Sequence, residues 1–125
     1  MAGGATVSYS KEKAEYILDG IRKGIAKGYR LRQCLSRLSF KDDAYRGKPC
    51  GCALVVSALG HGLIDVDQSY VQAGEALGLA TQERVDFAAG FDCPSGGVGS
   101  AENWFNFGKR LSKNCLRRCT NEVVK

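Results

Sequence analysis

The chain has 125 residues, 44% of them hydrophobic and 25% charged, which is the composition of an ordinary globular domain. No stretch approaches the roughly 18 apolar residues that span a bilayer, and the first residues lack the basic start and apolar run of a secretion signal. These features exclude membrane and secreted classes, so we expect a cytoplasmic protein with no membrane partner. Its six cysteines should then be reduced thiols rather than a disulfide framework.

The net charge of +5 is unevenly distributed along the chain. Residues 1–48 carry eleven Lys and Arg against five acids, a net charge of +6. Residues 49–108 carry one Arg against seven acids, a net charge of −6, and residues 109–125 return to +5. This pattern predicts either a polyanionic partner or pairing of the basic ends with the acidic middle.

The first fifty residues predict a tail, one helix and an ambiguous segment. Residues 1–9 read as a flexible tail, and residues 10–125 as a single helical domain. Ser8 or Ser10 can cap a helix that runs to about Lys27 and stops at Gly28. Its apolar positions recur at helical spacing: Ala14, Ile17, Leu18, Ile21 and Ile25. The segment from Tyr29 to Phe40 fits either an extended stretch or a helical turn, and residues 41–48 read as a polar loop.

The segment Cys50–Leu59 is the most hydrophobic part of the chain and follows Pro49. Plotted as a helix it is apolar on all sides except at Ser57, which is typical of a buried central helix. A buried strand is the competing interpretation, because Val55 and Val56 are β-branched. The length of the segment favours the helix.

Three further helices are expected after this segment. Asp67 can cap a helix over Gln68–Leu77 that stops at Gly78. Thr81 can cap the next, which ends before Gly90 and turns its apolar side inward through Val85, Ala88 and Ala89. After a loop over residues 93–99, Ser100 can cap a last helix over residues 101–119, with a stripe of Trp104, Gly108, Leu111, Cys115 and Cys119. The expected fold is therefore all-α or nearly so, a small bundle of about five helices around Cys50–Leu59, with one short extended segment near Tyr29–Gln33.

Several short motifs give the chain a resemblance to known proteins: Gly28–Gln33, Cys50–Leu54, Ala76–Leu79, Phe91–Asp92 and Trp104–Leu111. In this order they resemble a group of small, uncharacterised phage and bacterial helical proteins with a Cys-Cys-Leu-Gly or Cys-Ala-Leu-Gly buried helix. The resemblance covers most of residues 11–112. Val55-Val56 stands where that group has Gly, and Phe91 stands where it has Asn. The resemblance implies a helical fold and a phage or mobile-element context, and it implies no activity.

The cysteines and the single histidine offer candidate metal and thiol sites. Cys50, Cys52, His61 and Cys93 have the composition of a Cys₃His zinc site, but a Cys-x-Cys pair is an unusual spacing for zinc. Cys115 and Cys119 share one helix face beside Arg117 and Arg118, and could be redox-sensitive or join Cys34. In every case the simpler interpretation is that the cysteine is a small core residue. We therefore expect no cofactor and no metal.

Catalytic and phosphate-binding patterns are weak. A cysteine with His61 as base would need a third group to orient the imidazole, and the sequence shows no such arrangement. The loop Ser95–Ser100 is rich in glycine, yet it lacks the Lys-Ser/Thr that follows the glycines of a phosphate-binding loop. An enzyme is therefore the less favoured interpretation.

Basic residues supply the best candidate binding site. They fall in two clusters: Arg30, Arg32 and Arg37, with Arg22, Lys23 and Lys27 nearby, and then Lys109, Arg110, Lys113 and Arg117 on one side of the last helix. An ordinary solvated surface is the simplest explanation of such a face. The functional hypothesis is a non-catalytic accessory protein that binds a macromolecular partner with an acidic surface. A nucleic-acid-binding regulator is the alternative, and a zinc- or thiol-dependent protein is the third.

Overall fold

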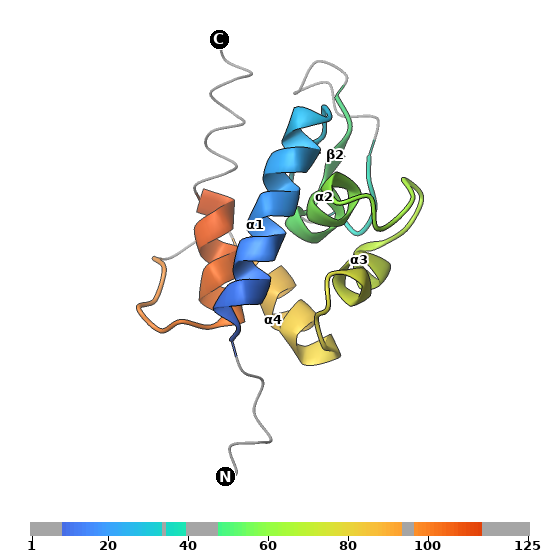
Figure 1. Ribbon diagram of the computed structural model, residues 1–125. Helices are drawn as coiled ribbons and strands as arrows, with labels where there is room; N and C mark the ends of the chain where they lie inside the picture. The colour runs from blue at the N-terminus through green and yellow to red at the C-terminus, as the bar shows by residue number, and fades with distance from the viewer. Residues whose placement is uncertain (1–8, 34, 40–47, 94–96, 114–125) are drawn as a thin grey trace.

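The computed structural model describes residues 9–33, 35–39, 48–93 and 97–113, and these are mostly helical (Figure 1). The prediction of a mainly helical protein is confirmed. The elements in chain order are α1 (Lys11–Ala26), β1 (Arg30–Leu31), β2 (Cys50–Gly51), α2 (Ala53–Gly60), α3 (Tyr70–Ala76) and α4 (Thr81–Asp92). A further helix covers residues 104–113. Within the described ranges, no helix has the length and apolar character needed to cross a membrane.

Helix α1 follows the sequence prediction closely. The Ser10 hydroxyl accepts a hydrogen bond from the Lys13 amide at 3.2 Å, so Ser10 is the N-cap. Ala14, Ile17 and Ile21 are buried along one face. The helix ends at Gly28, whose φ of 107° is one that other residues rarely adopt. The predicted start, inward face and stop are confirmed.

The segment after α1 is extended and pairs with residues twenty positions later. Strands β1 and β2 are parallel, with Arg30 opposite Cys50 and Leu31 opposite Gly51. Cys50 also exchanges two backbone hydrogen bonds with Ser39, of 2.7 and 2.8 Å. The predicted helix over Cys50–Leu59 therefore starts too early: its first residues belong to a sheet, and the helix begins only at Ala53.

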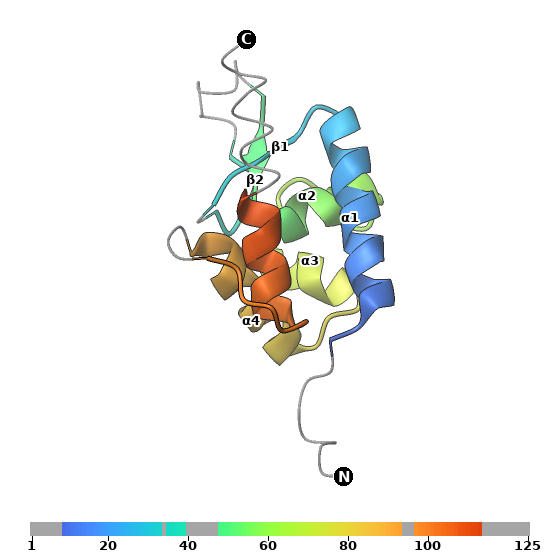
Figure 2. The ribbon, with the colours of Figure 1, turned by 90° about the vertical axis from the view of Figure 1, so that its left-hand side faces the viewer.

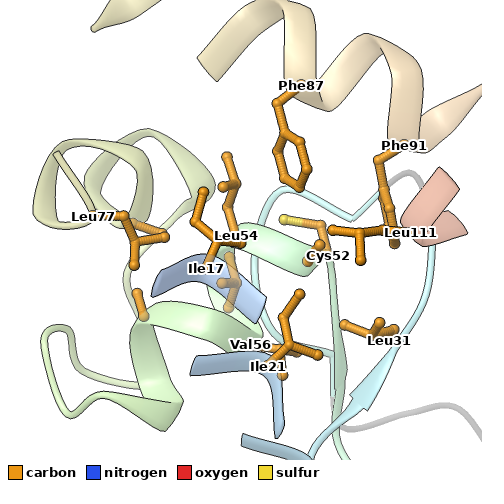
Figure 3. Close-up of a cluster of buried hydrophobic side chains, with 14 of the residues drawn as sticks. Ile17, Ile21, Leu31, Cys52, Leu54, Val56, Leu77, Phe87, Phe91 and Leu111 are labelled. Atoms are coloured by element: carbon orange, nitrogen blue, oxygen red, sulfur yellow. The ribbon is translucent and has the colours of Figure 1, made fainter. Parts of the chain in front are cut away.

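Helix α2 is the buried centre of the fold, as predicted. All of its residues from Ala53 to Gly60 are buried, and it packs against both α1 and α3. The Ser57 hydroxyl, its only polar side chain, donates a 2.8 Å hydrogen bond to the Ile17 carbonyl oxygen in α1. Figure 3 shows the core side chains that surround this helix. At Gly60 the backbones of α1 and α2 approach so closely that a Cβ atom would overlap the Gly20 carbonyl oxygen.

Helix α3 begins two residues later than predicted. Asp65 and Gln68 form a turn in which the Gln68 amide donates to the Asp65 carbonyl at 3.1 Å and the Gln68 side chain accepts from the Asp65 amide at 2.8 Å. Ser69 then serves as the N-cap, with Gln72 completing a capping box. Ser69 therefore takes the place of the predicted cap Asp67.

Helix α4 begins at Thr81, so its N-cap is Ala80 and not the predicted Thr81, and its predicted end and most of its predicted inward face are also wrong. It continues through Gly90 to Asp92. Phe87 and Phe91 face inward, whereas Val85 is 44% exposed and Ala89 is also exposed. Gly90 does not end the helix, because it is the point where the last helix crosses: a Cβ there would overlap the Phe105 carbonyl oxygen.

The last helix begins at residue 104 rather than 101. Asn103 caps it in place of the predicted Ser100, because its side-chain oxygen accepts from the Asn106 amide at 2.8 Å. Trp104 is 2% exposed and packs edge-on against Tyr9, with ring centroids 5.0 Å apart. Tyr9 was assigned to the tail and instead contacts the core. Residues 1–8, Cys115 and Cys119 lie outside the described residues.

Candidate partner-binding surface

Arg30 does not lie on the open surface that its place in the sequence predicted. It is 9% exposed, and its Nη1 donates hydrogen bonds to the carbonyl oxygens of Tyr29 at 2.8 Å and Ile25 at 3.2 Å. The guanidinium therefore binds carbonyl groups at the C-terminal end of α1, where positive charge is favourable. An arginine two residues after a helix-stopping glycine is a sequence signal for this capping role.

Lys109 is also turned inward, contrary to the prediction of a solvated basic face. It is 5% exposed, and its ammonium nitrogen lies 3.4 Å from the Cys93 sulfur and 5.8 Å from the centre of the Phe105 ring. Nothing in the periodicity of the last helix distinguishes Lys109 from its exposed neighbour Arg110. Its burial depends on where the end of α4 is placed, which the sequence does not reveal.

The remaining predicted residues divide among three places. The Gln33 side chain donates a 2.8 Å hydrogen bond to the Ser112 hydroxyl, so the backbone next to Arg32 and the backbone next to Lys113 lie near each other. Arg37 is exposed near the start of α3, where its guanidinium donates to the Asp67 carbonyl oxygen. Arg110 is exposed on the last helix. Arg117 lies outside the described residues.

The structure adds further cations beside Arg32 and Lys113. Figures 1 and 2 show that the C-terminal end of α1, the paired strands and the C-terminal end of the last helix all point toward the same end of the molecule. The Arg30 amide donates to the Pro49 carbonyl at 2.9 Å. Lys48, which precedes Pro49, therefore lies at this end as well. We call the following set the basic end: Arg22, Lys23, Arg32, Lys48 and Lys113. In the sequence, Arg22 and Lys23 belong to the first basic cluster, and no local pattern places them near Lys113.

Most of the basic end is exposed, and the acids of the middle region lie on other segments. Its Arg22, Arg32 and Lys48 are exposed, and Lys23 forms a 3.1 Å ion pair with Asp19 one turn earlier on α1. The acids of the middle region lie elsewhere, on the loop before α3, on α3 and on α4: Asp65, Asp67, Glu75, Glu83, Asp86 and Asp92. One of them, Glu83, is buried and pairs with Lys13 at 3.2 Å. The described acids of the middle region therefore lie on other segments than the five cations of the basic end.

The candidate zinc residues Cys50, Cys52, His61 and Cys93 are not assembled into a site. Cys52 precedes α2 and His61 follows it, so the eight-residue helix separates them by about 12 Å. His61 instead stacks on Tyr16, with ring centroids 3.9 Å apart, and its Nε2 lies 2.8 Å from the Tyr16 carbonyl oxygen. Cys50 is fully buried and Cys93 is partly buried beside Lys109. Among the residues that the structure describes, no three or more His, Cys, Asp or Glu side chains come together as metal ligands.

The buried thiol of Cys52 gives a prediction about alkaline pH. Burial raises the pKa of the Cys52 thiol from 9.0 to about 11, so the unfolded chain releases this proton at a lower pH than the folded one. The free energy of unfolding should therefore fall as the pH rises through the window from 9.0 to about 11, by an amount on the order of 2 kcal/mol. Urea unfolding of the wild type and Cys52→Ala across this window measures the difference. Parallel pH profiles for the two proteins would contradict the prediction.

The geometry thus leaves the basic end as the candidate site for a macromolecular partner. Among the described residues, Cys50, Cys52, His61 and Cys93 do not come together as a metal site. Comparisons of the chain with models of known protein families, with curated protein sequences and with solved structures found no match.

Proposed function

We propose that the protein is a cytoplasmic, non-catalytic binding protein whose basic end engages the acidic surface of a macromolecular partner. The observation that carries the proposal is convergence: α1, the segment after β1, the start of β2 and the last helix each bring at least one Lys or Arg to the same end. These segments are far apart in the sequence, and their arrangement in the fold supports a common binding surface. A patch of this kind attracts polyanions and accelerates their association. The resemblance stated above adds a phage or mobile-element context to the proposal.

The positions of two cysteines, the histidine and one lysine also support the proposal. The buried Cys50 and Cys52, the stacked His61 and the inward Lys109 are all held in contacts within the described fold. These residues therefore serve packing, whereas the exposed cations of the basic end do not fill the core. A nucleic acid and an acidic protein are both polyanions, and they differ in how the affinity depends on salt.

Neutralising the basic end should weaken binding to a polyanion. The test variant carries Arg22→Gln, Arg32→Gln and Lys113→Gln, and the matched control carries Lys11→Gln, Arg37→Gln and Arg110→Gln, three cations outside the basic end. On immobilised heparin, the test variant should elute at a clearly lower salt concentration than the control, although both lose the same net charge. Circular dichroism checks that both variants fold.

Equal elution of the two triple variants would contradict the proposal, because net charge alone would then explain retention. Titration of a labelled DNA duplex at two salt concentrations separates the nucleic-acid alternative. If phosphates bind the basic end, the slope of log K against log salt should decrease by about 1 for each phosphate-binding cation removed. Binding to polyglutamate but not to the duplex would favour an acidic protein partner.

A further inference from the structure

A pocket of about 200 Å³ lies between the segment that follows β1 and helices α2, α3 and α4. Figure 3 shows three of its labelled side chains, Cys52, Phe87 and Phe91, with the Cys52 sulfur directed toward the Phe87 ring. Most of the lining is apolar or aromatic. The lining residues are Leu35, Ser36, Cys52, Ala53, Leu54, Tyr70, Phe87, Ala88, Phe91 and Asp92.

The walls of this pocket are fixed by hydrogen bonds between segments. The Tyr70 amide donates to the Ser36 carbonyl at 2.8 Å, which ties the wall after β1 to the start of α3. The Gln33 side-chain amide donates to the Phe91 carbonyl at 2.8 Å, which ties the same segment to α4. The Arg84 guanidinium lies 5.6 Å from the centre of the Tyr70 ring and helps to hold that ring. The pocket is therefore formed without a ligand, as small-molecule sites usually are.

From this geometry we infer that the pocket binds a small, uncharged apolar molecule of about one aromatic ring. The size follows from the volume, since a cavity of about 150 Å³ already admits benzene. The preference for an uncharged ligand follows from the mostly apolar lining, because a charged group that leaves water loses hydration that apolar side chains do not replace.

The thiol in the wall supports an apolar ligand. Because burial raises the pKa of Cys52 to about 11, the thiol is neutral at physiological pH. A neutral thiol behaves as a small hydrophobic group rather than as a nucleophile. Binding should therefore be reversible and should leave Cys52 unmodified.

Three probes of similar size test the inference: indole, which is neutral, benzylamine, which is a cation, and benzoate, which is an anion. In titrations followed by amide chemical shifts, indole should shift residues of the lining in a saturable manner. Benzylamine and benzoate should each bind at least about tenfold more weakly than indole, because each would bring a charge into the apolar site. Mass spectrometry after incubation should show no adduct on Cys52.

The matched variants are Ala88→Phe, which fills the pocket, and Ala89→Phe, which places the same ring on the exposed neighbour. Ala88→Phe should weaken indole binding at least about tenfold, and Ala89→Phe should leave it unchanged. If Ala88→Phe does not fold, Ala88→Leu should still weaken binding measurably. Unaltered indole affinity in a folded Ala88 variant, equal affinity for benzylamine or benzoate, or no saturable shift at about 10 mM indole would overturn the inference.

Discussion

Replacing Gly60 with alanine is expected to lower the free energy of unfolding by about 3–5 kcal/mol, a large part of the stability of a small domain. The Cβ atom at this position would overlap the Gly20 carbonyl oxygen and would lie 2.6 Å from the Gly24 nitrogen. Both atoms belong to the backbone of α1, so no side-chain rotation can relieve the overlap. The two helices would have to move apart, and the apolar contacts between them would weaken.

Gly97→Ala is the matched control for this prediction, because no atom lies within 4 Å of a Cβ built at Gly97. Urea unfolding followed by circular dichroism compares the two variants with the wild type. The Gly97 variant should unfold within about 0.5 kcal/mol of the wild type. If the Gly60 variant did the same, α1 and α2 could not cross as closely as the structure places them.

Replacing Trp104 with alanine should have a comparable effect, a loss of about 3–5 kcal/mol. The indole is 2% exposed and lies among three aromatic rings, those of Tyr9, Phe87 and Phe107, with centroids 5.0 to 6.4 Å away. Removing it opens a cavity where α1, α4 and the last helix meet. The readout is urea unfolding by circular dichroism, since Trp104 is the single tryptophan of the sequence and its fluorescence is lost in the variant.

Trp104→Phe should cost much less than Trp104→Ala. Within the described residues the buried indole Nε1 has no hydrogen-bond partner, so replacing the indole with phenyl removes an unsatisfied donor together with some packing. The two effects oppose each other, and we expect a net loss of about 1 kcal/mol. Equal losses in the two variants would show that the indole has a hydrogen bond that the phenyl ring cannot replace.

Sequence patterns predict the ends and buried faces of those helices whose deciding residues lie close together in the sequence. Ser10 and Gly28 set the two ends of α1, and the periodic apolar residues between them set its buried face. The complete burial of α2 could likewise be predicted from its uniform hydrophobicity. In these cases the deciding interactions lie within a few residues of one another, which is the range that a sequence pattern reports.

Contacts between distant segments explain the errors. The pairing of β1 with β2 turns Cys50 and Gly51 into a strand, although hydrophobicity alone favours a helix there. Gly90 has the appearance of a helix stop, yet its function is to let Phe105 approach the backbone of α4. In both cases a partner far away in the sequence overrides the local preference.

Contacts between distant segments also decide which charged side chains of the candidate site are exposed. Counting basic residues identified Arg30 and Arg32 together, but only Arg32 faces solvent, because Arg30 caps the carbonyls at the end of α1. The grouping of Arg32 with Lys113 depends on the docking of the last helix beside β1 and has no local signal. The pocket at Cys52 could not be predicted either, since its walls come from four separate segments.

The side chain of Gln33 has a consequence for how the fold opens. Its amide nitrogen donates to the Phe91 carbonyl oxygen and to the Ser112 hydroxyl oxygen, both at 2.8 Å. It thus joins its own segment to two others, which lie 58 and 79 residues later in the sequence. Separation of the last helix would leave this partly buried amide without one of these two acceptors. Local fluctuation is therefore costly here, and backbone amides on both sides of this junction should exchange with solvent as one cooperative unit rather than one helix at a time.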